Sequence, residues 1–269
     1  MDIITSRTNP KIKRVRALRQ RKVRLQADSA FLVEGLHHVG AALESGFALE
    51  GVYYAPDLLR GEYSHRLIHT IRERAIPCYA TTADIFHSLA GKENPQGILA
   101  VADQPQASLE EIHPDRFPWG VALVEPQDPG NVGTILRTID AVGASGLLLL
   151  DGGVDPYHPT AVRASMGALF RLPVVSVSFA DFALWVEEHG YHVYGTSANA
   201  RVDYRSVGEH KQPLILLLGG EREGLSTQQT AICETVIRLP MRGKVSSLNL
   251  AVAAGVLLYT ILDKDESIC

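Results

Sequence analysis

The chain has 269 residues, 46% hydrophobic and 21% charged, a composition typical of globular proteins with one large or two ordinary domains. Its three cysteines, Cys78, Cys233 and Cys269, are an odd number, far apart and without CxxC pairing. This pattern argues against a disulfide framework or a zinc site, predicts no metal and fits a reducing cytoplasm. The net charge of −4 does not by itself suggest a nucleic-acid partner, and the absence of an apolar leader after Met1 predicts a cytoplasmic protein.

The first 26 residues carry an uneven share of the positive charge. They hold nine Lys or Arg and a single acid, Asp2, so this segment is near +8 and the remainder is near −12. Helical spacing predicts a helix whose apolar side carries Ile12, Val15, Leu18 and Leu25. So strong an asymmetry often marks a nucleic-acid contact, although a solvated basic helix face has the same composition.

Short β-type runs then alternate with helical stretches up to residue 102. We expect strands over 31–33, 51–55, 76–80 and 97–102, and helices over 36–45, 61–74 and 82–89. Residues 103–118 contain three prolines and few bulky apolar residues, as a connection between domains does. The predicted organisation is therefore a domain over 1–104, a linker over 105–118 and a second domain over 119–269.

The second domain contains continuous apolar runs at 147–150 and 214–218. Runs without alternation indicate strands buried on both faces, which favours a parallel sheet between two layers of helices. We expect its strands over 120–125, 146–150, 172–177, 192–196, 214–219 and 236–239, and its helices over 131–142, 160–169, 180–188, 227–233 and 247–262.

The last predicted helix, 247–262, is apolar on nearly every side, so we expect it to be packed all round. A core helix that also serves a dimer interface would meet this requirement. The apolar stretch is interrupted by Asn249 and Thr260 and is shorter than the roughly 18 residues that suggest a membrane span, so no membrane association is expected.

Three segments punctuated by glycine or proline follow predicted strand ends, where open α/β sheets bind ligands. They read EPQDPGNVGTILR at 125–137, LGGEREGLS at 218–226 and LPMRGKVSSLN at 239–249. Each alone has an ordinary interpretation, such as a strand-exit turn or a helix cap at Ser247. None matches the glycine patterns that bind dinucleotides or triphosphates.

Taken together, the stretches NVGTILRT, LGGEREGLS and LPMRGKVSSLNLAVAAGVLLY resemble, in order and spacing, the three motifs of the SpoU/TrmH family of RNA 2′-O-ribose methyltransferases. The resemblance covers residues 120–262. The opening SRTNPKIKRVRALRQRKVR…FLVEG is similar to the substrate-binding domain of bacterial members that act on 23S ribosomal RNA. Gly220 and Arg222 fill variable positions, and Ala251 stands where serine is common.

This resemblance implies an α/β, SPOUT-type parallel sheet with a C-terminal deep trefoil knot, preceded by a small α/β (ribosomal protein L30e-like) domain. General fold rules alone would predict no knot, because knots are very rare. It also implies a cytoplasmic homodimer that takes S-adenosyl-L-methionine as methyl donor, uses no metal and binds RNA. The residues expected to hold the methyl donor are Thr196, Gly219, Gly220, Glu221, Leu239, Met241, Ser247 and Leu248.

Arg137 matches the arginine to which the family mechanism assigns activation of the ribose 2′-hydroxyl. Because a guanidinium keeps its proton, we expect Arg137 to act as a fixed positive charge beside the developing alkoxide and the adjoining phosphate. Asn131 is expected to orient Arg137 or the RNA, while Glu221 could pair with Arg137 or another cation and is the reserve proton acceptor. The expected catalytic set is Arg137, Asn131, Glu221, Ser247 and Asn249, and the expected RNA contacts are Arg7, Asn9, Lys11, Lys13, Arg14 and Arg137.

Three alternatives stay open at this level. The same chemistry could act on transfer RNA, although the separate amino-terminal domain argues modestly against it. The chain could be a catalytically silent RNA-binding or ribosome-assembly factor, against which the intact catalytic set speaks. It could also protect the ribosome from an antibiotic. The target nucleotide cannot be read from the residues.

Overall fold

The computed structural model describes residues 3–19, 30–91 and 93–264, which form two compact units. The first unit comprises Met1–Pro105 and Tyr157–Arg171, and the second comprises Gln106–Pro156 and Leu172–Cys269. The first unit is therefore discontinuous in the sequence. Among the described residues, no helix is both long and apolar enough to cross a membrane.

The first unit contains a four-stranded sheet in the order β1-β4-β2-β3. Strand β4 is antiparallel to both of its neighbours, and β2 and β3 are parallel. All four predicted strands of this region are present. The elements are β1 (Ala30–Glu34), β2 (Leu49–Tyr54), β3 (Cys78–Ala80), β4 (Ile98–Asp103), α1 (Pro10–Leu18), α3 (Leu36–Glu44), η1 (Pro56–Leu58), α4 (Gly61–Glu73), α5 (Ala83–Leu89), α7 (Pro159–Ala164) and η3 (Ala168–Phe170).

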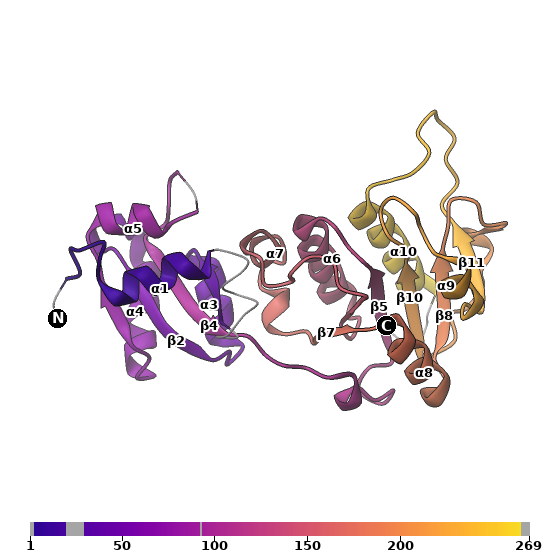
Figure 1. Cartoon of the computed structure of the whole chain (residues 1–269), viewed down its shortest axis with the longest axis horizontal. Helices are drawn as coiled ribbons and strands as arrows, with labels where there is room; N and C mark the ends of the chain where they lie inside the picture. Colours follow the sequence, from indigo (N-terminus) through magenta and orange to yellow (C-terminus); the bar gives the residue numbers. More distant parts are fainter. Residues whose placement is uncertain (1–2, 20–29, 92, 265–269) are drawn as a thin grey trace. The chain divides into compact units, whose positions relative to one another are not determined.

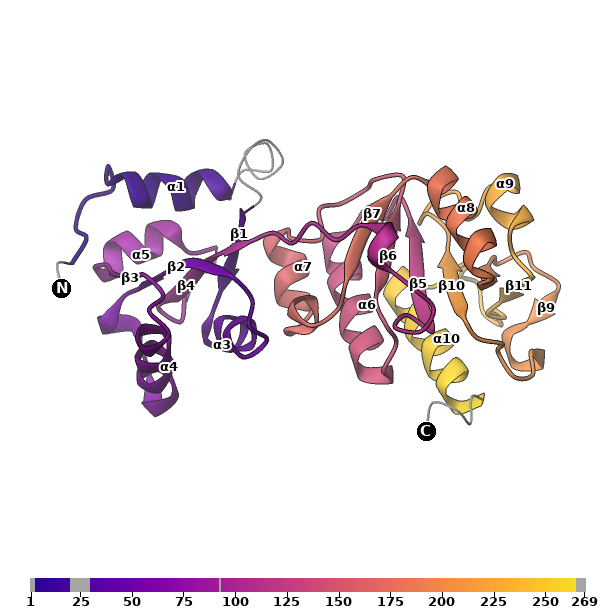
Figure 2. The ribbon, with the colours of Figure 1, turned by 90° about the horizontal axis from the view of Figure 1, so that it is seen from below.

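Helices cover both faces of this sheet, with α1 and α5 on one face and α3 and α4 on the other (Figure 2). The predicted apolar side of α1 is confirmed for Ile12, Val15 and Leu18, which are buried in one cluster, whereas Leu25 lies outside the described residues. The helix begins after Asn9, whose side chain accepts a hydrogen bond from the backbone N–H of Lys11. Pro10 occupies the first helical position, where its missing N–H costs nothing.

The continuous helix predicted over 160–169 is wrong. Helix α7 ends at Ala164, and Met166 and Gly167 take positive φ values of 50° and 95° before the short η3 turn begins. A right-handed helix cannot continue through two such residues. A Cβ on Gly167 would lie 2.9 Å from the Ala41 side chain, so the close approach of the chain at this point requires glycine.

The second unit contains a seven-stranded sheet in the order β7-β6-β5-β10-β8-β11-β9 (Figure 1), and every pairing is parallel. The predicted parallel sheet is thus confirmed. Only β9 was missed, because a two-residue strand carries no periodic signal. The elements are η2 (Leu109–Glu111), β5 (Trp119–Val124), α6 (Pro129–Val142), β6 (Leu147–Leu150), β7 (Val174–Val177), α8 (Phe179–His189), β8 (His192–Thr196), β9 (Val202–Asp203), η4 (Tyr204–Ser206), β10 (Leu214–Leu218), α9 (Thr227–Ala231), β11 (Thr235–Arg238) and α10 (Leu250–Lys264).

Helices α6 and α10 lie on one face of this sheet, and α8 and α9 lie on the other (Figure 2). Both β6 and β10 are buried along their whole length, as their unbroken apolar runs predict. Helix α10 starts at Leu250 rather than at the predicted residue 247. In the single chain Val252, Val256 and Tyr259 are 53%, 37% and 50% exposed, so the expectation that this helix also serves a dimer interface stays a prediction.

Candidate active site

A cavity of about 790 Å³ lies at the carboxyl edge of the second unit's sheet. Residues at or just beyond the ends of β8, β10 and β11 line it, together with the start of α6. This is the edge where parallel sheets present loops to ligands. All eight residues expected to hold a methyl donor line the cavity: Thr196, Gly219, Gly220, Glu221, Leu239, Met241, Ser247 and Leu248.

A chain of side-chain hydrogen bonds joins the three sequence segments. The amide nitrogen of Asn131 donates to a Glu221 carboxylate oxygen at 2.7 Å, and the amide nitrogen of Asn249 donates to Asn131 Oδ1 at 2.9 Å. These three residues lie 90 and 118 positions apart in the sequence. The pairing expected between Glu221 and Arg137 is replaced here by the bond to Asn131.

The position of Asn131 follows from the way α6 begins. Asp128 caps the helix, since its carboxylate accepts the N–H of Gly130 at 2.7 Å, and Pro129 takes the first helical position. Asn131 therefore falls in the first turn and is 8% exposed. A buried amide must have both its donor and its acceptor satisfied, and Glu221 and Asn249 supply these partners.

The turn that presents Glu221 depends on its glycines. Gly220 and Gly224 exchange backbone hydrogen bonds of 3.2 and 2.9 Å, and Gly224 has a φ of 70°. A Cβ on Gly219 would lie 2.2 Å from the carbonyl carbon of Gly224. Any side chain at residue 219 would therefore open the turn and move Glu221.

Asn249 is the residue that the third sequence segment contributes to the hydrogen-bond chain. Its Oδ1 accepts the backbone N–H groups of Ala251 and Val252 at 2.9 and 3.3 Å, so it caps α10. The capping role considered for Ser247 thus belongs to Asn249, because the helix starts three residues later than predicted. Ser247 is exposed and lines the cavity.

Two protein-family models match the chain, and one of them covers the segments that build this site. A model of the SpoU rRNA Methylase family matches residues 118–259, more than half of the chain, and a model of the MRM3-like substrate binding domain matches residues 9–100. The chain belongs to the SpoU rRNA methylase family. The resemblance drawn from the three segments is therefore confirmed.

Relatives of this SpoU family member align over nearly its full length. The 23S rRNA (uridine(2479)-2′-O)-methyltransferase of Streptomyces viridochromogenes is 33% identical over 95% of this chain and 90% of its own length. The 23S rRNA (guanosine(2553)-2′-O)-methyltransferase RlmP of Bacillus subtilis is 31% identical, covering 96% and 98%. The crystal structure of AdoMet-bound rRNA methyltransferase from Sinorhizobium meliloti matches with a TM-score of 0.87 at 33% identity, covering 97% of each chain.

Arg137, by contrast, does not line the cavity. It lies on α6 six residues after Asn131, and its side chain is exposed. From this position it can meet a ligand that approaches from solvent, whereas the hydrogen-bond chain runs from Asn249 through Asn131 to Glu221. Sequence reasoning placed Arg137 and these residues in one catalytic set, and the shared catalytic role of the set stays a prediction.

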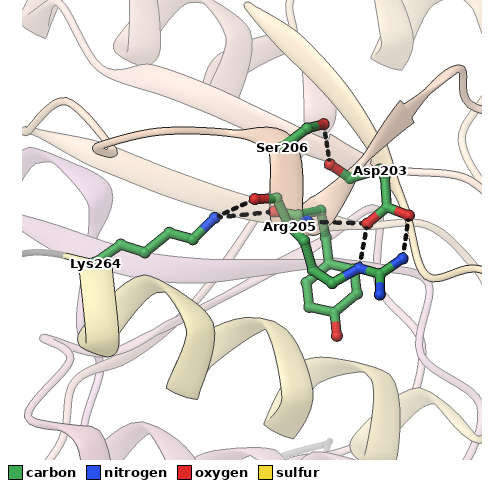
Figure 3. Close-up of polar contacts among 5 residues, drawn as sticks. Asp203, Arg205, Ser206 and Lys264 are labelled. Carbon is green, nitrogen blue, oxygen red and sulfur yellow. Dashed lines mark hydrogen bonds and ion pairs between the residues drawn. The ribbon is translucent and has the colours of Figure 1, made fainter.

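Sequence reasoning missed residues 197–199, which directly follow β8 and form a wall of the cavity beside Thr196. Its position after a strand end was the available signal. This segment continues into β9 and η4. There Lys264 of α10 donates to the backbone carbonyls of Tyr204 at 3.4 Å and Arg205 at 2.9 Å (Figure 3), and also to that of Val207. One ammonium group therefore links the end of α10 to the segment that follows the wall.

The same turn is held by a fork between Asp203 and Arg205, with N–O distances of 2.9 and 2.8 Å (Figure 3). The side-chain hydrogen bonds from Arg205 hold the pKa of the Asp203 carboxyl well below its usual range. Burial raises the pKa of the Cys233 thiol to about 11. This thiol packs against the apolar core of the second unit and donates to the Gln229 carbonyl.

The residues expected to contact RNA from the first unit lie on and before α1. Arg7 forms an ion pair with Asp84, Arg14 with Glu50, and Asn9 caps the helix. The Lys11 ammonium lies 4.0 Å from the centre of the Tyr79 ring, and Lys13 is exposed. Arg21, Lys22 and Arg24 of the basic segment lie outside the described residues.

Proposed function

We propose that this chain transfers the methyl group of S-adenosylmethionine to a ribose 2′-hydroxyl in RNA, and that 23S ribosomal RNA is its substrate. The observation that carries the proposal is the hydrogen-bond chain from Asn249 through Asn131 to Glu221, which joins the three family motifs around one cavity. Two curated relatives that align over almost the whole chain are named as 23S rRNA 2′-O-methyltransferases, which favours ribosomal over transfer RNA.

The cavity suits S-adenosylmethionine in size and chemistry. Its volume of about 790 Å³ lies within the range usual for small-molecule pockets. Apolar side chains such as Leu239 and Leu248 offer surfaces for an adenine ring, and the backbone beside Gly219 and Gly220 offers hydrogen-bonding groups. The Glu221 carboxylate supplies a negative charge that attracts a sulfonium. The methyl-donor structure matched at 33% identity supports the same assignment.

S-adenosylmethionine, when bound, supplies a methyl group on a positively charged sulfur. The chain must place the ribose oxygen in line behind that methyl group, and placement alone can lower such barriers by up to about 7–11 kcal/mol. The hydroxyl proton must also leave. We assign to Arg137 the stabilisation of the developing alkoxide and contact with the adjoining phosphate, because a guanidinium holds its charge throughout.

Glu221 remains the reserve proton acceptor. Asn131 donates to one of its carboxylate oxygens at 2.7 Å, which fixes the carboxylate's orientation. Asn131 thereby acts as a positioning residue for Glu221, while Ser247 and Asn249 complete the polar side of the cavity. A silent RNA-binding factor would have no need of this arrangement.

We further propose that the chain acts as a homodimer. Val252, Val256 and Tyr259 recur on α10 at four- and three-residue intervals and are exposed in the single chain. Contiguous exposed apolar residues on one helix face mark association surfaces. Helix α10 lies against α6, so a second copy on this face would lie close to the elements that build the site.

The decisive variant is Arg137→Ala. We expect its affinity for S-adenosylmethionine, measured by calorimetry, to stay within about twofold of wild type, while ribose methylation of 23S rRNA falls below about 1% of wild type. That hundredfold loss corresponds to about 2.7 kcal/mol of transition-state stabilisation. Exposed Arg116 in the same unit provides the matched control, and Arg116→Ala should keep full activity.

Methyl transfer is measured with radiolabelled S-adenosylmethionine, and ribose methylation is mapped as resistance of the adjacent phosphodiester to alkali. Retention of more than a few percent of turnover by Arg137→Ala would contradict the role of this arginine. Methylation of transfer RNA in preference to 23S rRNA would show that transfer RNA is the substrate. Failure to bind S-adenosylmethionine would contradict the proposal as a whole. Mapping in cells with and without the gene identifies the nucleotide.

A further inference from the structure

The cavity wall at 197–199 has no apolar anchor of its own. None of residues 197–209 is buried, and β9, which follows the wall, lies at the edge of the sheet. Contacts with β11 support it on one side: the Ser197 N–H donates to the Ile237 carbonyl at 3.0 Å, and β9 pairs with β11 over two residues. A segment with so few buried contacts opens locally at low cost. Its position therefore depends on further polar contacts.

Local hydrogen bonds shape the segment into two turns. In the first, the Ala200 N–H donates to the Ser197 carbonyl at 3.2 Å. In the second, η4, Ser206 Oγ donates to the Asp203 carbonyl at 2.6 Å beside the fork between Asp203 and Arg205 (Figure 3). These bonds join residues two or three positions apart, so they fix the shape of each turn. They do not fix where the turns lie against the rest of the unit.

Lys264, the last described residue of α10, ties the second turn to that helix. Its ammonium donates to the carbonyls of Tyr204 at 3.4 Å and Arg205 at 2.9 Å (Figure 3), and also to that of Val207. An ammonium has three N–H donors, and three carbonyls of one turn lie within their reach. Hydrogen bonds from a charged donor are among the strongest in proteins. Lys264 therefore holds η4 against the end of α10.

Helix α10 connects this tie with the cavity. Leu250, Ala253 and Leu257 of the helix line the cavity, and Lys264 follows Leu257 by about two turns. At the start of the helix, Asn249 takes part in the hydrogen-bond chain of the site. The helix thus contributes cavity residues of its own and, at its far end, fixes the segment that follows the wall.

We infer that Lys264 is a positioning residue for the methyl-donor site: its ammonium holds η4 and β9, and through them the wall at 197–199, in the conformation that binds S-adenosylmethionine. The inference rests on the proposed function, because it takes S-adenosylmethionine as the ligand. Lys264 does not line the cavity, so it acts through the wall and not on the ligand. A ligand binds more weakly in proportion as the binding-competent conformation becomes rarer.

The test variant is Lys264→Met, which keeps most of the length of the side chain without its charge. We expect S-adenosylmethionine binding, measured by calorimetry, to weaken about tenfold, as a wall correctly placed in about one molecule in ten requires. The KM for S-adenosylmethionine in 23S rRNA methylation should rise by the same factor, while kcat at saturation stays within about twofold of wild type. Lys211→Met is the matched control. Its ammonium lies 3.5 Å from Glu234 in the same unit, and the variant should keep wild-type affinity.

S-adenosylhomocysteine separates positioning from a simple effect of charge. It lacks the positive charge on sulfur, so removal of a nearby cation would change its affinity and that of S-adenosylmethionine differently. A displaced wall penalises both ligands equally, and we expect Lys264→Met to raise both dissociation constants by one common factor. Lys264→Arg keeps the charge, but a planar guanidinium matches three convergent carbonyls less well than a compact ammonium. It should weaken both ligands about threefold.

Hydrogen exchange measures the wall directly. In ligand-free Lys264→Met, the amides of 197–207 should exchange about tenfold faster than in wild type, while those of β10 keep their wild-type rate. Saturating S-adenosylmethionine should restore slow exchange at 197–207. Unchanged exchange there, unequal losses for the two ligands, or a lowered kcat with an unchanged KM would overturn the inference.

A second variant covers the case in which Lys264→Met does not fold. Asp203→Asn weakens the fork in the same turn and should also raise both dissociation constants by one common factor. Wild-type affinity for both ligands in a folded Asp203→Asn protein with faster exchange at 197–207 would contradict the dependence of binding on this segment. Failure of the wild-type chain to bind S-adenosylmethionine would instead count against the proposed function itself.

Discussion

Asn249 uses a single side chain for two hydrogen-bonding tasks. Its oxygen caps α10, and its nitrogen donates to Asn131, which in turn donates to Glu221. The start of the last helix and the orientation of the Glu221 carboxylate are therefore set by the same residue. At the scale of residues, the shape of the site depends on this coupling between a helix cap and a polar chain.

Substitution of Asn249 separates the two tasks. Serine also caps helices but is too short to reach Asn131, whereas alanine does neither. We expect Asn249→Ala to lose about 1–2 kcal/mol of unfolding free energy, and Asn249→Ser to lose only a few tenths. Both should weaken S-adenosylmethionine binding at least tenfold. Urea unfolding and calorimetry measure the two effects, and wild-type cofactor affinity in Asn249→Ser would show that the Asn131 link is dispensable.

Helix α10 combines two different surfaces. Ala254, Leu257, Leu258 and Ile261 are buried against the sheet and α6, whereas Val252, Val256 and Tyr259 are exposed. At the scale of elements, the proposed homodimer would explain why the sequence is apolar on every side: one side belongs to the core of the chain, and the other would meet the second copy. Burying an apolar side chain stabilises an interface by about 25 cal/mol per Å².

Charged substitutions on this face should dissociate the proposed homodimer without unfolding the chain. We expect the double variant Val252→Glu with Tyr259→Glu to sediment with the 29.3 kDa mass of one chain, and to lose methylation at micromolar concentration. Leu184→Glu is the matched control, because Leu184 of α8 is 66% exposed but lies elsewhere. A wild type that sediments as a single chain, or a dissociation caused equally by Leu184→Glu, would contradict the assignment.

At the scale of the whole molecule, the discontinuity of the first unit is the feature that matters. Phe170, far along the sequence, lies with its ring centre 5.2 Å from that of Phe47 and 6.4 Å from that of Phe31. Tyr157 adds a contact with Phe31 at 4.7 Å. A single boundary at residues 105–118 would assign Tyr157 and Phe170 to the second unit and would therefore split the aromatic core of the first unit.

Phe170→Ala should destabilise the first unit selectively. We expect a loss of about 3–5 kcal/mol, the usual effect of truncating a buried phenylalanine. Both tryptophans, Trp119 and Trp185, belong to the second unit, so their fluorescence follows that unit alone, whereas far-ultraviolet circular dichroism follows both. The unfolding transition followed by circular dichroism should shift to a lower urea concentration, whereas the transition followed by fluorescence should keep its wild-type midpoint. As the reverse control, Phe182→Ala removes a ring beside Trp185 and should shift the fluorescence transition.

Much of this protein was determined by local sequence. Unbroken apolar runs predicted the buried strands, and helical spacing predicted the apolar side of α1. Glycine and proline positions marked the three motif segments. Each of these signals depends only on residues that are neighbours in the chain. The three motif segments also identified the family, and the eight residues expected to hold the methyl donor all line the cavity. A two-residue strand such as β9 and the break at Met166 left no such trace, since tertiary contacts impose them. The expected trefoil knot stays a prediction.

Other properties were decided only by tertiary structure. Sequence could not tell which arginines of the basic segment meet carboxylates, because Glu50 and Asp84 lie 36 and 77 residues away from their partners. It could not separate Arg137 from the cavity or join Asn131 to Glu221, since these relations depend on how α6 and the strand-end loops are brought together. Charge and motif are local properties, whereas pairing is a property of the folded chain.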